Sequence, residues 1–176
     1  GHSSSSYNAK VYTSDISSFT ANGVDHIHNV GYSQGCDAGS FDTSDAILEQ
    51  FILSPTGYVA WVGNTRYGFG IHYTTNGSSQ YYHRQYVDAL FGEGIHRLGA
   101  ANGDSRADNV GYIDYEANRW VHYEITAFGD PAMPVWTATP QQPLVSHAGV
   151  FVLGTSEYTV TVEAAGGPVA GARICA

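Results

Sequence analysis

The feature that most constrains the fold is a strand, helix and strand in succession, joined by short loops. Residues His26 to Gln34 predict a strand, and Asp45 to Leu53 predict a helix because apolar residues recur there at i, i+1, i+4 and i+5. Tyr58 to Val62 is a near-continuous apolar run, which is typical of a strand buried on both faces. This order predicts a parallel βαβ unit, and hence an α/β fold with a parallel sheet flanked by helices.

Two further helices are expected after this unit, separated by a polar irregular stretch from Asn102 to Asn109. The first covers Ser79 to Phe91 and the second Tyr115 to Thr126. On the first helix, the side chains expected to face the core are Tyr86, Val87, Leu90 and Phe91. On the second helix they are Trp120, Tyr123 and Ile125.

The pattern changes after Trp136, where Pro140 and Pro143 indicate a linker. Val150 to Leu153 and Glu157 to Val162 then alternate apolar and polar residues, as half-buried strands do. Two or three strands cannot close a core alone. We therefore predict a first domain over residues 1–137 and the incomplete start of a β domain over residues 138–176.

Composition excludes some classes of function. The net charge is −9 with only seven Lys and Arg, so binding through nucleic-acid phosphates is not expected. No apolar run approaches the ~18–20 residues that a membrane-spanning helix needs. Apolar residues make up 43 % and charged residues 13 %, with 21 Gly and 13 Tyr, which suits an extracellular or envelope protein with a real core.

Cys36 stands where the first predicted strand ends, at the carboxyl edge where catalytic groups of open α/β sheets gather. Its neighbours Gly35, Ala38 and Gly39 are small, which gives a substrate access to the thiol and to backbone N–H groups. A buried structural cysteine is the alternative on spacing alone. Cys175 is interpreted as a small buried residue unrelated to Cys36.

The run from Tyr32 to Asp42 (YSQGCDAGSFD) resembles the nucleophile segment of the gingipain family of cysteine peptidases. Ala46 to Phe51 is similar to the helix that follows in that family, and Val59 to Tyr67 to its next strand and loop. Phe128 to Pro131 resembles the motif that closes the catalytic domain, and Gly1 to Ser3 the family's Gly-His-Gly segment. The segments occur in the family's order and cover most of the chain.

This resemblance implies a cysteine endopeptidase of caspase-like fold that acts on proteins or peptides and needs no cofactor. Cys36 would be the nucleophile and His2, 34 positions earlier, its general base. The backbone N–H groups of Ser3 and Cys36 would form the oxyanion hole, although Ser3 replaces the family's glycine. Phe69 would line the substrate pocket.

The resemblance also implies a secreted or cell-surface protein without a membrane span, in which residues 1–137 are an N-terminally truncated catalytic domain. Residues 138–176 would begin an immunoglobulin-like domain. Because part of the catalytic domain would be absent, we expect this fragment alone to be poorly folded or inactive.

Other interpretations remain open. The fold could serve as an inactive binding module on the cell surface, and His2 could be the remnant of a purification tag. His26 and His28, two positions apart on the predicted strand, could hold zinc in a zinc hydrolase, although no third ligand is apparent. The acidic loop containing Asp37, Asp42 and Asp45 could be a cation site or a pocket for basic side chains, or could be acidic only because it is solvated and precedes a helix. The resemblance makes calcium a candidate structural ion, although no loop has a recognisable ligand spacing.

Overall fold

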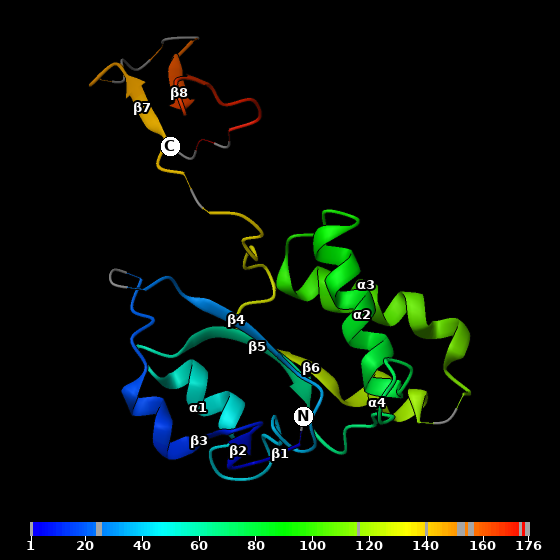
Figure 1. Cartoon of the computed structure of the whole chain (residues 1–176). Helices are drawn as coiled ribbons and strands as arrows, with labels where there is room; N and C mark the ends of the chain where they lie inside the picture. The colour runs from blue at the N-terminus through cyan, green and yellow to red at the C-terminus, as the bar shows by residue number, and fades with distance from the viewer. Residues whose placement is uncertain are drawn as a thin grey trace. The chain divides into compact units, whose positions relative to one another are not determined.

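A computed structural model describes residues 2–23, 26–115, 117–139, 141–150, 154, 157–172 and 174. The chain divides into two compact units, Gly1–Thr137 and Ala138–Ala176. Figure 1 shows the larger unit as a sheet with helices on both sides. Each unit is described separately below.

The larger unit is built on a three-stranded sheet of order β4-β5-β6. Strand β4 (Asn29–Ser33) pairs with β5 (Tyr58–Asn64) in parallel, and β5 pairs with β6 (Ile125–Phe128) antiparallel. Helix α1 (Ile47–Leu53) connects the parallel pair. The predicted βαβ unit and the mixed α/β class are therefore confirmed.

Both faces of the sheet are covered, because β5 sends successive side chains to opposite sides. Val62 packs with α2 (Ser78–Phe91), α3 (Leu98–Asn109) and α4 (Asn118–Glu124). Trp61 packs on the other side with α1 and the 3₁₀ helix η1 (Thr13–Ser18). The first core consists of Ala60, Val62, Tyr82, Tyr86, Ala89, Leu90, Leu98, Ala101, Val121, Ile125 and Val135; the second consists of Ile16, Ala38, Ile47, Leu48, Phe51 and Trp61.

Two of these helices begin with the same local hydrogen bond. Three residues after the N-cap, Glu49 accepts the Ala46 backbone N–H at 3.0 Å and Gln80 accepts the Gly77 N–H at 2.7 Å. This is half of a capping box, and it satisfies a backbone donor that the helix itself cannot pair. The short strands β1 (Ser3–Ser4), β2 (Tyr7–Asn8) and β3 (Val11–Tyr12) form an antiparallel meander before η1.

The prediction of irregular structure over Asn102–Asn109 is wrong, because this stretch lies within α3. The helix buries small and polar side chains rather than an apolar stripe. Ser105 donates to the Asn102 carbonyl at 2.9 Å, and Asn109 donates to the Ser105 carbonyl at 2.7 Å. Because the helix's own carbonyls satisfy these groups, they can be buried without a large cost. The 3₁₀ helix η2 (Val110–Tyr112) follows.

The predicted helix from Tyr115 to Thr126 is too long, and of the three residues predicted to face inward only Ile125 is buried. Helix α4 ends at Glu124, and Ile125 begins β6. Trp120 and Tyr123 are 70 % and 74 % exposed. On α2, Val87 and Phe91 are likewise exposed, whereas Tyr82, Tyr86, Ala89 and Leu90 are buried. Aromatic content alone did not indicate which helix face packs on the sheet.

The smaller unit contains a three-stranded antiparallel sheet of β7 (Leu144–His147), β8 (Val160–Ala164) and β9 (Gly167–Pro168). Strand β7 was not predicted; it directly follows Pro143, one of the two prolines that indicated a linker. Strand β8 overlaps the predicted strand from Glu157 to Val162. The strand predicted from Val150 to Leu153 and the residue Cys175 lie outside the described residues.

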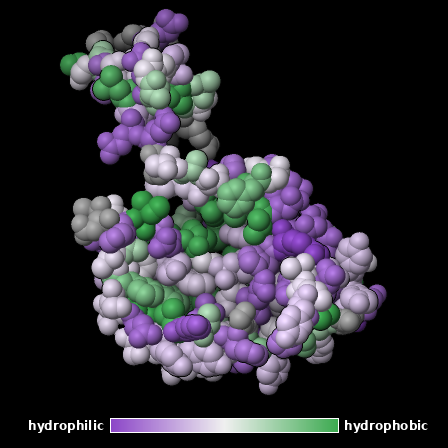
Figure 2. All heavy atoms as spheres, in the orientation of Figure 1, coloured by the Kyte–Doolittle hydropathy of each residue, from purple (hydrophilic) through white to green (hydrophobic). Residues whose placement is uncertain are grey.

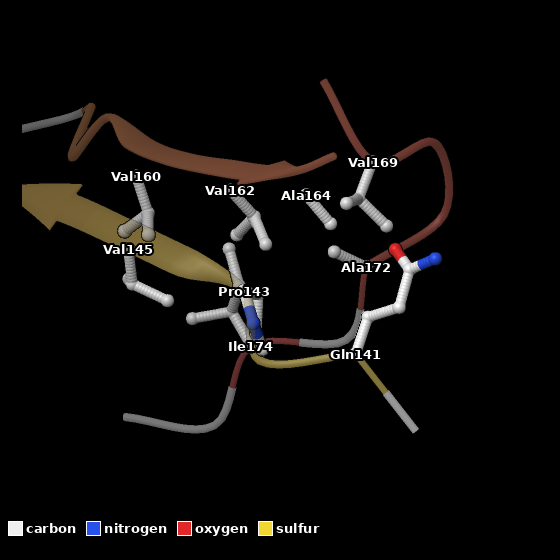
Figure 3. Close-up of a pocket in the computed structure, with 9 residues that line it drawn as sticks. All are labelled: Gln141, Pro143, Val145, Val160, Val162, Ala164, Val169, Ala172 and Ile174. Atoms are coloured by element: carbon white, nitrogen blue, oxygen red, sulfur yellow. The ribbon is translucent and has the colours of Figure 1, made fainter. Parts of the chain in front are cut away.

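One face of this small sheet is apolar. It lines a groove of about 500 Å³ (Figure 3) bordered by Gln141, Pro143, Val145, Val160, Val162, Ala164, Val169, Ala172 and Ile174. In the space-filling view, hydrophobic side chains reach the surface of this unit (Figure 2). Within the part of the chain that the structure describes, no helix is long and apolar enough to cross a membrane.

Candidate active site

Cys36 lies just beyond the carboxyl end of β4, and the loop after it crosses the end of β5. Asp37 N–H donates to the Arg66 carbonyl at 2.7 Å, and Gly39 N–H donates to the Asn64 carbonyl at 3.0 Å. A Cβ atom on Gly39 would lie 2.5 Å from the Phe128 ring, so glycine is needed for this close crossing. The half-buried Cys36 is therefore held at the edge of the sheet rather than within the core.

The segment containing His2 and Ser3 lies against Cys36. Ser3 Oγ donates a hydrogen bond to the Cys36 carbonyl at 2.8 Å, although the residues are 33 positions apart. The His2 carbonyl accepts the Ala9 N–H at 3.0 Å, which anchors the histidine to the meander. The His2 side chain is exposed, and among the described residues it makes no hydrogen bond to the Cys36 thiol. Catalytic hydrogen bonds are often long in proteins without substrate.

The two backbone N–H groups predicted to form the oxyanion hole belong to Ser3 and Cys36, the residues that this side-chain hydrogen bond joins. Among the described residues, no protein acceptor binds the Cys36 N–H, whereas those of Asp37 and Gly39 are both used. Asp37 adopts a left-handed conformation with φ of 54°. This turn redirects the chain immediately after Cys36.

The loop after β5 closes the other side of Cys36. The thiol contacts the Gly68 carbonyl at 3.7 Å. Phe69, which is 37 % exposed, follows, and its backbone N–H donates to Ser79 Oγ at 2.9 Å. Ser79 N–H in turn donates to the Phe69 carbonyl at 2.9 Å. The predicted pocket residue Phe69 is thus next to the residue that contacts the thiol.

Asn64 connects the ends of both parallel strands and was not singled out from the sequence. Its side chain is completely buried, and its amide nitrogen lies 3.1 Å from the Gln34 carbonyl, 3.3 Å from the Gly35 carbonyl and 3.2 Å from Ser79 Oγ. Asn64 therefore ties the strand that leads to Cys36 to the loop that faces it. The sequence signal that could have identified Asn64 was a polar residue at the end of an apolar strand.

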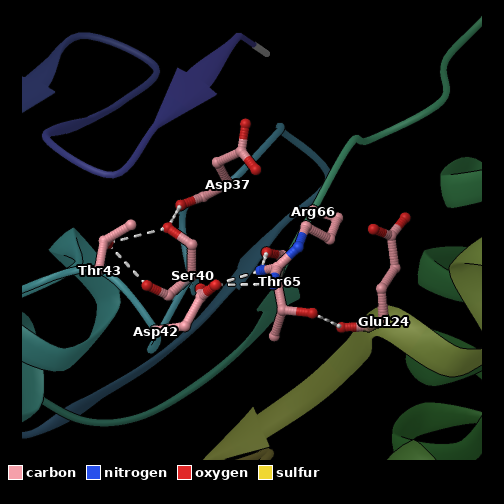
Figure 4. A network of polar contacts seen from close by, with 7 residues as sticks. All are labelled: Asp37, Ser40, Asp42, Thr43, Thr65, Arg66 and Glu124. Atoms are coloured by element: carbon pink, nitrogen blue, oxygen red, sulfur yellow. Dashed lines mark hydrogen bonds and ion pairs between the residues drawn. The ribbon is translucent and has the colours of Figure 1, made fainter.

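The acidic loop is partly neutralised by Arg66 (Figure 4). Arg66 binds both carboxylate oxygens of Asp42, at 3.0 and 2.8 Å, in a half-exposed pair. Glu124 lies nearby at the end of α4, directly before β6, and is only 7 % exposed. Burial, reinforced by the charge of Asp37, raises the pKa of Glu124 to about 7.

Helix α2 contacts β4 and the residue after it through the partly buried His83. His83 Nδ1 lies 2.5 Å from the Gln34 side-chain amide, and the His83 ring stacks on Tyr32 with centroids 4.2 Å apart. Burial lowers the pKa of His83 and raises that of Tyr32 above its ordinary value. Sequence reasoning missed this contact because it joins residues on separate elements.

The histidines proposed as zinc ligands are not on a strand, because β4 begins only at Asn29. His26 Nδ1 bonds Thr20 Oγ1 at 2.9 Å. Among the described residues, the one group of three metal-binding side chains within 4.8 Å is Glu93, Asp104 and Asp108, and it includes neither histidine. The zinc interpretation therefore lacks a third ligand in the described part of the chain.

The fold and this edge define a mixed α/β protein with a cysteine at the carboxyl end of a parallel strand. The chain belongs to peptidase family C25, whose family model matches residues 1–136. It is therefore a member of a cysteine peptidase family of gingipain type, as its sequence resemblance predicted.

Solved structures with the same fold include the Arg-specific cysteine proteinase gingipain R (RGPB), with a TM-score of 0.75 and 16 % identity over 93 % of this chain and 38 % of that chain. A complex of the pro- and mature domains of Porphyromonas gingivalis RgpB matches with a TM-score of 0.70 and 16 % identity, covering 93 % of this chain and 39 % of that chain. A structure titled only as a protease has a TM-score of 0.62 and 14 % identity over 92 % of this chain and 40 % of that chain.

The chain thus spans only 38–40 % of the length of these solved chains. No protein in the curated set matches it. At these identities the structural likeness supports the fold alone.

Proposed function

We propose that the protein is a cysteine endopeptidase with Cys36 as nucleophile and His2 as general base. The observation that carries the proposal is the 2.8 Å hydrogen bond from Ser3 to the Cys36 carbonyl, in a chain of peptidase family C25. This bond brings the segment containing the histidine to the cysteine from 33 positions away. His2 is exposed and Cys36 is half-buried, so both side chains are accessible to a substrate.

The chemistry follows from these groups. His2 takes the proton of the Cys36 thiol, and the thiolate attacks the carbonyl carbon of the scissile peptide bond. The N–H groups of Ser3 and Cys36 stabilise the negative oxygen of the tetrahedral intermediate. His2 then donates its proton to the leaving amine as the C–N bond breaks, and water hydrolyses the Cys36 thioester.

Phe69 is proposed as one wall of the substrate pocket, because it follows the Gly68 carbonyl that contacts the thiol. The substrates are proteins or peptides, and no cofactor takes part in the steps above. Calcium as a structural ion is part of the proposal, and the three carboxylates of Glu93, Asp104 and Asp108 are the described residues that support it.

The two units are proposed to be the gingipain-like catalytic domain, over residues 1–137, and part of an immunoglobulin-like domain, over residues 138–176. The apolar face of the β7-β8-β9 sheet supports the second assignment, because the inner face of a β-sandwich sheet packs on another sheet. A secreted or cell-surface location is proposed from the family.

The experiment is alkylation of Cys36 by iodoacetamide across pH in a Cys175→Ser background, with and without His2→Ala. We expect fast labelling well below the ~8.5 at which a free thiol titrates, and loss of that advantage in His2→Ala. Peptide hydrolysis should disappear in Cys36→Ala. Ordinary thiol behaviour that is unaffected by His2→Ala would reject the dyad.

An inactive binding module is the second candidate, and the absence of a hydrogen bond between His2 and Cys36 in the described structure favours it. It predicts a folded chain in which Cys36 labels like a free thiol. The same labelling profile therefore separates the two functions.

A further inference from the structure

Gln34 is fixed at both its side chain and its backbone, two residues before Cys36. Its side-chain amide nitrogen lies 2.5 Å from His83 Nδ1 on α2. Its carbonyl accepts the Asn64 amide at 3.1 Å. The Gly68 backbone is packed so closely on this carbonyl that a Cβ on Gly68 would lie 2.0 Å from it.

The position of Gln34 therefore affects the surroundings of the thiol. Gly68, which packs on the Gln34 carbonyl, also provides the carbonyl that contacts the Cys36 sulfur at 3.7 Å. A shift of Gln34 would move both the end of β4 and the loop that faces the thiol. His83 is the side chain of α2 that limits such a shift.

The hydrogen bond requires a neutral imidazole. The Gln34 amide nitrogen is a donor, so Nδ1 must accept and the ring proton must be on Nε2. The described groups around His83 support this state: the stacked Tyr32 and, beyond it, Tyr86 both have pKa values raised by burial and stay uncharged. The charge of Arg106 on α3 opposes the rise in the pKa of Tyr32.

We propose that His83 is a positioning residue, which holds the segment that carries Cys36 in its reactive geometry through the side chain of Gln34. The inference rests on the proposed cysteine peptidase function and extends it to a residue outside the dyad. His83 itself takes no part in proton transfer with the substrate.

Two substitutions separate the hydrogen bond from the ring stacking. His83→Asn places an amide oxygen near the position of Nδ1 and keeps the acceptor without the ring. His83→Phe keeps a ring that can stack on Tyr32 but has no acceptor. In the Cys175→Ser background, we expect His83→Phe to slow Cys36 alkylation roughly tenfold, because misplacement by about 1 Å costs up to ~100-fold in reactions that depend on geometry. His83→Asn should keep most of the rate.

The pH profile gives a readout that a purely structural role would not move. As pH falls below the ordinary His value of ~6.5, a protonated Nδ1 cannot accept, whereas Asn does not titrate. The rate of the natural protein should therefore fall relative to His83→Asn on the acid side. If His83→Phe does not fold, Gln34→Met removes the same hydrogen bond from the partner and should slow alkylation equally.

Parallel measurement of His2→Ala distinguishes the two proposals. A rate that depends on His2 but is unchanged in His83→Phe and Gln34→Met overturns the positioning role alone. A rate that depends on His83 and Gln34 but not on His2 supports positioning and overturns the dyad. Slowing in His83→Asn with an unchanged rate in His83→Phe would show that the ring matters and the acceptor does not, which also overturns the inference.

Discussion

Gly68→Ala tests how closely the loop after β5 packs on the segment that leads to Cys36. An added Cβ would lie 2.0 Å from the Gln34 carbonyl oxygen, 2.8 Å from the Asn64 amide nitrogen and 3.0 Å from the Gln34 carbonyl carbon. The two nearest atoms cannot rotate away freely, because one is backbone and the other belongs to a completely buried side chain.

The size of the effect follows from these distances. To reach even the 3.0 Å below which Cβ contacts essentially do not occur, the loop and Gln34 must separate by about 1 Å. Overpacking of this kind costs about 1–3 kcal/mol of unfolding free energy. Because the Gly68 carbonyl contacts the thiol, a displacement of this size should also slow Cys36-dependent peptide hydrolysis by up to ~100-fold.

The assay compares urea unfolding and peptide hydrolysis in Gly68→Ala and in Gly103→Ala. Gly103 lies inside α3 with nothing within 4 Å of an added Cβ, so alanine there should stabilise the protein by about 0.5–1 kcal/mol and leave hydrolysis unchanged. If Gly68→Ala has the unfolding free energy and the activity of the natural protein, the packing argument fails.

Three further predictions concern the same edge of the sheet. Since the folded-state pKa of Glu124 is about 7, above the ordinary 4.5, the folded state binds the proton more tightly than the unfolded state. The unfolding free energy should therefore fall by up to about 3 kcal/mol as pH rises from 4.5 to 7. Urea unfolding at both pH values should show that Glu124→Gln removes this fall. Asn64→Asp places a carboxylate against two carbonyl groups and should cost about 3–5 kcal/mol at pH 7, less at pH ~4 where it protonates; equal loss at both pH values would contradict this reasoning. Arg66→Ala removes a half-exposed ion pair and should lower the unfolding free energy by less than about 1 kcal/mol in a chemical denaturation.

The parallel strand pair and its helix could be predicted because their signals are local. Residues Tyr58 to Val62 are apolar without interruption, and Ile47, Leu48 and Phe51 share one helix face. The same reasoning failed for α3, since Ser105 and Asn109 are buried with hydrogen bonds to their own helix. Hydropathy records whether a side chain is apolar, not whether a polar one finds a partner.

The candidate site could be predicted only in part. Cys36 was marked by its place after a strand, and His2 only by resemblance to a family. Asn64 was marked only as a polar residue at the end of an apolar strand, and the contacts of His83 and Glu124 had no local signal, because each joins elements that are far apart in the chain. Their roles depend on which atoms the fold brings within hydrogen-bond distance.

The sequence by itself therefore determined the α/β class, the family and the location of the cysteine at the end of a strand. These follow from periodicity and from motifs that occupy short stretches of chain. Only the tertiary structure decided which side chains surround the cysteine, because the antiparallel addition of β6 brings Glu124 to the edge and the packing of α2 brings His83 to Gln34. Burial and partner geometry depend on all elements at once, so no single stretch of sequence contains them.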